Sequence, residues 1–267
     1  MGGPPRPPFG PEGFEAMTKI EHILYFLEES FSPGAFPDYP HALNGLQVEG
    51  PVEVGHVGAA VDASEETIEE AVRRGVDLLV VHHGLLWEGL GPITGPRFRK
   101  LAALLKGGVG LYSLHLPLDA HPVLGNNAIL IRELGIEPQG RFGSFENIEI
   151  GWWASASLHR NELLQRLEGA VDGEARLIPG GPEEVRRVGV LSGGGASALS
   201  EGARMGLDTL ITGEAPHHAY HEAMELGMNL LLGGHYATET FGVKATAKRL
   251  AEEFSLSWEF LHFPTGL

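Results

Sequence analysis

The sequence predicts an α/β protein with two similar domains, each built on a mainly parallel β-sheet covered by helices. Short apolar runs alternate with amphipathic stretches, and strands that are apolar on both faces are typical of parallel sheets buried on two sides. The 267 residues, 43% of them hydrophobic, are enough to fill one large core or two smaller ones. Similar short motifs recur in the two halves of the chain, which favours an internal duplication.

The first half contains the clearest alternation of elements. Residues 1–16 are rich in proline and glycine, and we expect a flexible leader there. A helix should follow, because Ile20, Ile23 and Leu27 have helical spacing. Strands are predicted at residues 57–61, 76–81 and 109–114, and helices at 64–75, 98–105 and 129–134. Ser64 is the expected N-cap of its helix, and Gly75 should end that helix.

The second half repeats this pattern after a less regular stretch. Strands are predicted at residues 149–157, 175–178, 188–191, 208–211, 228–232 and 257–262. Helices are predicted at residues 159–167, after the loop 192–195 up to Met205, at 217–225 and at 243–254. The helix at 98–105 should bury Phe98, Leu101, Ala102 and Leu105 on one side.

The internal repeat suggests where the domains divide. A shift of 131 residues places Gly58 on Gly189 and Asp77 on Asp208, and a shift of 120 places the segment 115–119 on 235–239. We predict a first domain from residues 17–125 and 236–267, a second from 126–235, and a site in the cleft between them.

Composition excludes several classes of function. The chain has no cysteine, so disulfides, iron–sulfur clusters, thiolate zinc sites and cysteine nucleophiles are ruled out. A net charge of −16 makes nucleic-acid binding unlikely, because that function needs a clustered basic face. Neither a transmembrane run nor a signal-peptide pattern is recognisable, so we expect a soluble cytoplasmic protein.

Four polar clusters follow predicted strands. They are His82-His83, His115 with Asp119, Glu214 with His217-His218, and His235 with Glu239. Ligands of parallel sheets bind beyond the carboxyl ends of the strands, so these positions suit a site. Imidazole and carboxylate groups without sulfur suit Zn, Fe, Mn or Co. Adjacent strand residues alternate in direction, so the rings of His82 and His83 should diverge and could serve two metals.

Each feature also has a plainer interpretation. A single histidine is more often a surface or hydrogen-bonded residue than a ligand, whereas two adjacent rings at a buried strand end need partners. The loop 192–195 could expose N–H groups to a phosphate near Arg186 and Arg187, or could be a simple tight turn. Trp87 and Tyr236 could stack on a base or only pack beside the clusters. Neither Ser113 nor Ser192 has a convincing catalytic triad.

Five motifs occur in a fixed order along the chain. They are Asn44-Gly45-Leu46-Gln47-Val48, His82-His83-Gly84-Leu85-Leu86-Trp87, His115-Leu116-Pro117-Leu118-Asp119, Thr212-Gly213-Glu214 and Gly234-His235-Tyr236-Ala237-Thr238-Glu239. Together they resemble a known family, the GTP cyclohydrolase I type 2 homologues, also called Nif-three-like proteins. The resemblance runs from about Met17 to the C-terminus. One departure is Leu116-Pro117, where polar residues are more usual in the family. Some members carry an inserted domain, which we expect this chain to lack.

The resemblance implies a dinuclear metal centre between two α/β domains and assembly into a ring-like homohexamer. The positions that match the family's metal ligands are His82, His83, Asp119, His235 and Glu239, with Glu239 as the bridge and His115 as a further ligand or a neighbour. We therefore expect a metal-dependent hydrolase of a nucleotide or related small molecule, with Glu214, His217 or His218 moving protons. The alternative is a non-catalytic metal-binding scaffold or metal carrier that mediates protein interactions.

Overall fold

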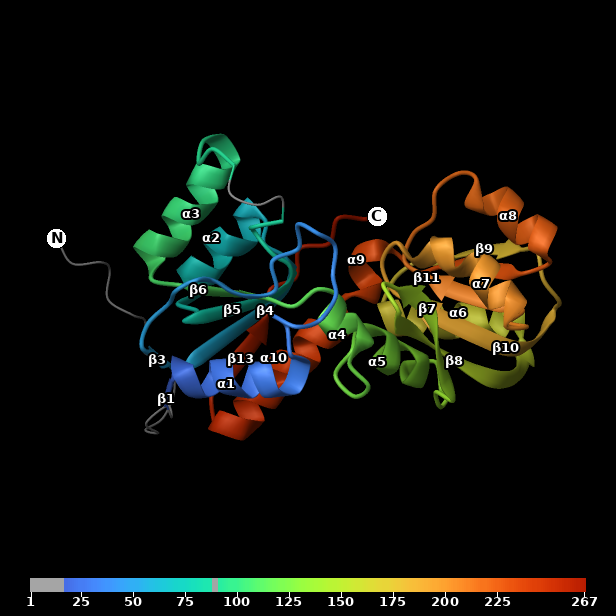
Figure 1. Cartoon of the computed structure of the whole chain (residues 1–267), viewed down its shortest axis with the longest axis horizontal. Coiled ribbons are helices and arrows are strands. Elements are labelled where there is room, and N and C mark those ends of the chain that lie inside the picture. The colour runs from blue at the N-terminus through green and yellow to red at the C-terminus, as the bar shows by residue number, and fades with distance from the viewer. Residues whose placement is uncertain (1–16, 88–90) are drawn as a thin grey trace.

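The computed structural model describes residues 17–87 and 91–267, and it forms two lobes that each surround one β-sheet (Figure 1). The predicted leader, residues 1–16, lies outside the described residues. The predicted α/β class is confirmed. Within the described ranges, none of the helices combines the length and the apolar character that a membrane crossing requires.

The first lobe contains a five-stranded sheet in the order β13-β4-β5-β6-β2. Its strands are β2 (Gly45–Val48), β4 (His56–Asp62), β5 (Leu78–His83), β6 (Gly110–Ser113) and β13 (Ser257–Phe260). Three of the four pairings are parallel, and only β2 runs antiparallel, beside β6. A small ribbon of β1 (Thr18–Lys19) and β3 (Glu53–Val54) lies apart from this sheet. The sheet is mainly parallel, as the sequence predicts.

Helices cover both faces of this sheet (Figure 1). They are α1 (Ile20–Phe31) and α10 (Thr240–Phe254) on one face, with α2 (Glu65–Arg74) and α3 (Gly95–Gly107) on the other. In β5, Leu78 and Val80 pack towards α1 and α10, whereas Leu79 and Val81 pack towards α2 and α3. This two-sided burial explains the continuous apolar run in the sequence.

Local signals place helix α2 correctly and helix α3 only in part. The Ser64 hydroxyl accepts a hydrogen bond from the Thr67 N–H, and Gly75 ends α2 with φ of 70°. In α3, however, Phe98 is 55% exposed and Leu105 is 68% exposed. The predicted apolar side is therefore wrong for Phe98 and Leu105, whereas Leu101 packs against the same core as Leu104, the one fully buried residue of α3.

The second lobe contains a six-stranded sheet in the order β7-β8-β10-β11-β12-β9. Its strands are β7 (Gly140–Phe145), β8 (Ile148–His159), β9 (Arg176–Pro179), β10 (Glu184–Leu191), β11 (Thr209–Thr212) and β12 (Asn229–Leu232). Only the pairings β10–β11 and β11–β12 are parallel. The sheet is mixed, so the expectation of a mainly parallel sheet is wrong for this lobe.

A tight hairpin accounts for part of that difference. Glu146 and Asn147 connect β7 to β8, and both have positive φ, 44° and 71°. Two consecutive residues of this conformation form the kind of turn that reverses a chain into an antiparallel pair. Strand β7 was not predicted, because residues 140–145 contain two glycines and show little apolar alternation.

Helices also cover the second sheet. They are α5 (Asn126–Glu133) and α6 (Arg160–Val171) on one face, with α7 (Leu199–Arg204), α8 (Ala219–Leu226) and the 3₁₀ turn Gly195–Ala198 on the other. Two short helices, α4 (Leu116–Ala120) and α9 (His235–Thr238), lie where the chain leaves the first lobe and where it returns. They sit between the two sheets (Figure 1).

The two lobes share a set of equivalent hydrogen bonds. The Asp77 carboxylate accepts from the N–H groups of residues 55 and 56, and the Asp208 carboxylate accepts from those of residues 186 and 187. These pairs are related by the same shift of 131 residues that the sequence suggests. The strand runs β4-β5-β6-β2 and β10-β11-β12-β9 also match, each ending in an antiparallel edge strand. Duplication stays a prediction that these bonds support.

Candidate metal centre

Six of the predicted residues meet between the lobes. His82 and His83 end strand β5, His115 and Asp119 lie one turn apart at α4, and His235 and Glu239 lie one turn apart at α9. Their side-chain atoms form three groups in which all potential ligand atoms lie within 4.8 Å of one another. The groups are His82 with His83 and His115, His83 with His235 and Glu239, and His82 with Asp119 and Glu239.

The histidine pair does not diverge as the strand rule predicts. The ring centroids of His82 and His83 lie 4.7 Å apart, and the planes are tilted by 47°. His83 is the last residue of β5, and its Nδ1 lies 2.8 Å from Asp62 at the end of β4, a contact that fixes the direction of its ring. The two rings still have different neighbours. His82 lies in a group with Asp119, whereas His83 lies in a different group with His235.

The spacing of the facing atoms fits a bound cation. His82 Nε2 lies 3.5 Å from both Asp119 Oδ2 and Glu239 Oε1, and His83 Nε2 lies 3.4 Å from Glu239 Oε2. These distances are longer than normal hydrogen bonds. Two ligands of one tetrahedral zinc ion are separated by about 3.4 Å, which is close to the observed spacing. Both His82 Nε2 and Glu239 Oε2 are buried without a hydrogen-bond partner, so the donor set fits a metal.

Each of the four candidate histidine ligands has a contact at Nδ1, the ring nitrogen that faces away from the centre. The Nδ1 atoms lie at 2.8 Å from Leu114 O for His82, 2.8 Å from Asp62 for His83, 2.8 Å from Asp38 for His115 and 3.0 Å from Glu214 for His235. Each acceptor favours the tautomer that carries the proton on Nδ1, which leaves the Nε2 lone pair facing the centre. Such anchoring is typical of metal-binding histidines and fixes the ring orientation.

The carboxylates are anchored as well. Asp119 Oδ1 accepts hydrogen bonds from Asn126 Nδ2 at 2.8 Å and from the Ser192 hydroxyl at 3.0 Å. Its other oxygen, Oδ2, is the one that faces His82. Gly193 approaches Glu239 closely, since an added Cβ there would lie 2.1 Å from Glu239 Oε1. The loop 192–195 thus supports the candidate ligands, and its predicted role in binding phosphate has no counterpart in these contacts.

The enclosed charges shift several pKa values. Burial alone lowers the pKa of His82, but the nearby charges of Asp119 and Glu239 raise it well above its usual value. Burial would raise the pKa of Glu239, whereas the neighbouring histidines, His82 foremost, lower it far below its usual value. Burial also lowers the pKa of His115, which the hydrogen bond to Asp38 partly offsets. A cation would replace the protons that these opposite charges attract.

His235 gives a pH dependence that can be measured. Its hydrogen bond to Glu239 raises its pKa to about 9, so the metal-free protein carries a proton there at neutral pH. A folded-state pKa above the usual 6.5 stabilises the metal-free fold fully below about pH 6.5, and this stabilisation is lost as the pH rises through about 9. A metal at this nitrogen must displace the proton.

We therefore expect metal addition at about pH 7.5 to release protons, and the release should decline above about pH 9. Titration calorimetry in buffers of different ionisation enthalpy measures the number of protons released. The His235→Gln variant provides the control and should release fewer. Equal release by both proteins at every pH would contradict the assignment of His235.

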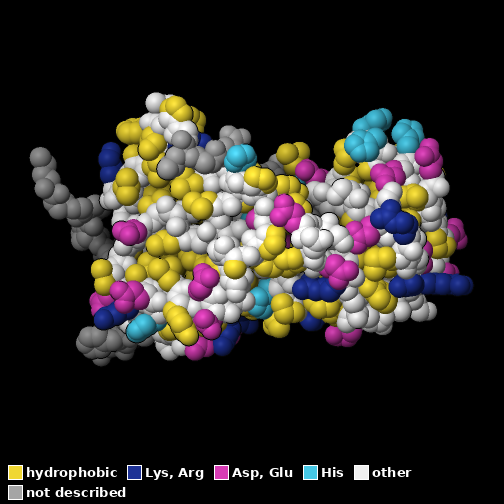
Figure 2. Space-filling view, in the orientation of Figure 1, with side chains coloured by type: hydrophobic (Ala, Val, Ile, Leu, Met, Phe, Trp, Pro, Cys, Tyr) yellow, Lys and Arg dark blue, Asp and Glu magenta, His cyan; other side chains and the backbone are white. Residues whose placement is uncertain are grey.

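The three predicted proton-transfer residues lie at the edge of this centre or away from it. Glu214 is exposed and contacts His235 on the outer side of its ring, at Nδ1. His217 and His218 are exposed at the start of α8, where histidine side chains gather on the surface (Figure 2). None of the three lines the cavity beside the candidate ligands. Their role in proton transfer stays a prediction, and the geometry favours an orienting contact for Glu214.

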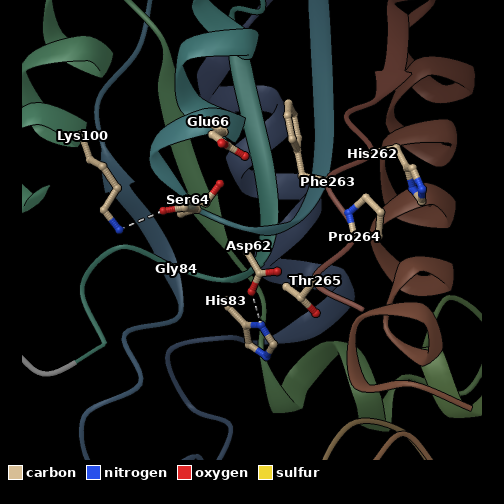
Figure 3. A pocket seen from close by; sticks show the side chains of 11 residues that line it. Asp62, Ser64, Glu66, His83, Gly84, Lys100, His262, Phe263, Pro264 and Thr265 are labelled. Atoms are coloured by element: carbon tan, nitrogen blue, oxygen red, sulfur yellow. Dashed lines mark hydrogen bonds and ion pairs between the residues drawn. The ribbon is translucent and has the colours of Figure 1, made fainter. Parts of the chain in front are cut away.

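Two cavities meet at His83. The smaller, of about 310 Å³, is lined by five of the six candidate ligands, all except the fully buried His82. The larger, of about 620 Å³, lies behind the His83 ring and is lined by Asp62, Glu66 and Lys100 among others (Figure 3). There Asp62 holds His83, and Lys100 donates to the main-chain oxygen of Ala63 at 3.0 Å. The smaller cavity is the one that faces the candidate ligands.

The sequence analysis did not identify two acids that anchor the histidines, and only one of its two aromatic candidates reaches the site. Asp38 was missed because it lies in an irregular segment with no periodicity. Asp62 directly follows a predicted apolar strand, so the rule that found His82 would have found it as well. Trp87 does reach the site, with its ring 4.5 Å from that of His115. Tyr236 instead packs, since its hydroxyl accepts a hydrogen bond from Phe263 N at 2.8 Å.

The Asp62 contact can be tested by substitution. Asp62→Ala removes the acceptor that fixes His83, and loss of such a partner typically weakens metal binding about 10- to 100-fold. Isothermal titration with zinc or manganese measures the change. Glu66→Ala is a matched control, because Glu66 lines the same larger cavity and makes no hydrogen bond to any of the six candidate ligands. Similar affinity of the two variants would show that Asp62 does not position His83.

Comparison with known proteins agrees with this architecture. Residues 18–265 match the family model described as Duf34/NIF3 (NGG1p interacting factor 3). The GTP cyclohydrolase 1 type 2 homolog of Deinococcus radiodurans is 42% identical over 251 residues, covering 92% of this chain and 94% of that protein. Solved structures of protein ybgI, of unknown function, and of TTHA1606 from Thermus thermophilus superpose with TM-scores of 0.87 and 0.83, at 37% and 39% identity. Each superposition covers 94% of this chain and 100% of the other. With the match to the family model spanning nearly the whole described chain, the protein belongs to the Duf34/NIF3 family.

Proposed function

We propose that the protein is a dinuclear metal-dependent hydrolase that acts on a nucleotide or a related small molecule. The observation that carries this proposal is the convergence of four histidines and two carboxylates beside an open cavity of about 310 Å³. A site that only braces a structure is normally closed by protein ligands, whereas a catalytic site keeps room for water and substrate. The name of the 42% identical relative supports a nucleotide as the substrate.

The overlapping groups of ligands suit two cations. Glu239 belongs to two of the three groups and presents both of its oxygens to the histidines, so it is the proposed bridge between two neighbouring ions. His82 and His83 also belong to two groups each, but each ring has one free nitrogen and would bind a single ion. Zn, Fe, Mn or Co all accept this donor set. We further propose the domain division at residues 126 and 235, which the internal repeat suggests, and a cytoplasmic location. The family resemblance also implies a ring-like homohexamer, which we propose as the assembly.

Divalent ions at these positions would supply Lewis-acid activation of a water molecule and of a polarised substrate atom. The chain's own residues would hold the geometry for that chemistry. The four Nδ1 contacts keep each imidazole in the tautomer that can bind a cation, and Asn126 and Ser192 keep one oxygen of Asp119 directed at the centre. The side chains of both lobes that line the cavity would orient the substrate and exclude bulk water.

Turnover by metal-loaded protein tests this proposal. The protein is saturated in turn with each candidate metal and incubated with GTP, other nucleotides and simple phosphoesters. We expect metal-dependent hydrolysis of at least one of them, abolished by Glu239→Gln. A saturated site that turns over none of these compounds would instead favour the non-catalytic metal-binding scaffold or carrier.

A further inference from the structure

Three aromatic side chains line the cavity beside the candidate ligands and lie close to one another. They are Tyr39, from the irregular segment after α1, Trp87, just beyond β5, and Phe145, at the end of β7 in the second lobe. The ring of Tyr39 lies 4.9 Å from that of Phe145 and 6.4 Å from that of Trp87. We call these three side chains the aromatic rim. Tyr39 is 51% exposed, so much of its ring is available to a ligand.

The aromatic rim is tied to the candidate metal centre. The main-chain N–H of Tyr39 donates to Asp38 Oδ1 at 2.7 Å, and the same carboxylate anchors His115. Trp87 meets the His115 ring edge-on, with centroids 4.5 Å apart. On the other side of the cavity, Glu201 accepts from the N–H groups of Gly143 and Ser144 and so holds the end of β7 next to Phe145. These contacts fix the rings at defined positions beside the candidate ligands.

The charges in the cavity do not suit a polyphosphate. No lysine or arginine occurs among the described residues that line it, whereas Asp119, Glu201 and Glu239 all do. The charge of two divalent ions would be largely balanced by these three carboxylates, which leaves little to attract a triphosphate. Arg141, in the same strand β7 as Phe145, does not line the cavity: it stacks on Trp152 at 4.0 Å and donates to main-chain oxygens.

The size and the remaining polar groups suit a compact ring system. A volume of about 310 Å³ is at the lower end of the range for small-molecule sites. Ser144, Gly194 and Ser197 also line this cavity and offer polar groups that can bond to the edge of a heterocycle. Aromatic faces, edge hydrogen bonds and few net charges together describe a site for a nucleobase.

We propose that the cavity recognises the uncharged, planar heterocycle of a nucleobase or nucleoside by stacking it against the aromatic rim, and does not recognise a triphosphate. This inference rests on the proposed function, because it names the part of the substrate that the same site selects. It assigns Tyr39, Trp87 and Phe145 as specificity-determining residues, which neither the donor set nor the family name identifies.

Binding, measured without turnover, tests the inference. Equilibrium dialysis of metal-loaded protein compares guanosine, GTP and inorganic tripolyphosphate. We expect guanosine to bind at least as tightly as GTP, and tripolyphosphate not to displace it. Tyr39→Ala should weaken guanosine binding roughly five- to 150-fold, the effect of removing one stacked ring. Tyr39→Phe should restore the affinity, because it retains the ring.

Two controls keep the outcomes separate. Tyr25→Ala removes another exposed tyrosine, on α1 and outside the cavity lining, and should leave guanosine binding unchanged. Metal content should be equal in all of these variants, which shows that the centre is intact. Tight GTP binding that tripolyphosphate competes away, or guanosine binding that survives Tyr39→Ala, would overturn the inference.

Failure of the inference and failure of the proposed function are distinguishable. Guanosine binding through Tyr39 without turnover of any compound would refute the hydrolase and keep the stacking site. Metal-dependent hydrolysis of GTP with no effect of Tyr39→Ala would do the reverse. If no nucleoside binds and Tyr39→Ala changes the mass measured by light scattering, the aromatic rim is an interface between copies of the chain and the inference is wrong.

Discussion

Replacing Glu239 with glutamine should prevent the protein from holding the two cations that we propose. The two oxygens of this carboxylate face His82, His83 and His235 at 3.2–3.5 Å, so the residue belongs to both the groups that contain a carboxylate. Glutamine keeps the size but loses the charge and one of the two anionic oxygens. The loss of affinity should exceed the roughly 10- to 100-fold effect of removing an outer hydrogen-bond partner.

Elemental analysis of protein purified without added metal, together with titration calorimetry, measures this change. Glu253→Gln is the matched control, since Glu253 is an exposed acid on α10 that pairs only with Arg249 among the described residues. Circular dichroism should show that both variants fold. Retention of both ions by Glu239→Gln would mean that Glu239 does not bridge them.

Replacing Gly193 with alanine should have the next largest effect. Gly193 has a φ of 59°, and its added Cβ would lie 2.1 Å from Glu239 Oε1 and 3.2 Å from His235 Nε2. Left-handed backbone costs a residue with a side chain about 1–2 kcal/mol. The contact with Glu239 adds to this strain, because the carboxylate is buried and must move out of its position. We expect both a lower melting temperature and metal affinity reduced at least about tenfold.

The neighbouring glycine provides an internal control for that experiment. Gly194 has a negative φ of −86°, and nothing lies within 4 Å of a Cβ built there. Gly194→Ala should therefore change neither the melting temperature nor the metal content. If the two alanine variants behaved alike, the close approach of Gly193 to Glu239 would have no role in the site.

The elements that the sequence predicted best are those whose two faces are both buried. Strand β5 is apolar throughout because α1 and α10 cover one face while α2 and α3 cover the other. Strands β2 and β7 were missed because each contains glycine, shows little apolar alternation and lies at the edge of its sheet. Antiparallel pairing in the second lobe was also missed, since the turn at Glu146 and Asn147 lacks the glycine that commonly marks such hairpins.

The candidate site was also predicted only in part. The residues that converge were identified from the sequence, because metal-binding residue types stand directly after predicted strands or four residues apart in the chain. The anchors of the imidazole rings were less visible, since the Leu114 acceptor is a main-chain oxygen and Asp38 arrives from a segment without regular spacing. Contacts of this kind depend on tertiary packing, which a local pattern does not encode.

The positions of α4 and α9 have a mechanical consequence. The chain crosses from one lobe to the other at α4 and crosses back at α9, and each crossing supplies a histidine and a carboxylate to the same centre. A hinge between the lobes would have to bend at these two crossings. Cations bound by residues from both crossings would restrict bending there, so metal binding should also reduce motion of one lobe relative to the other.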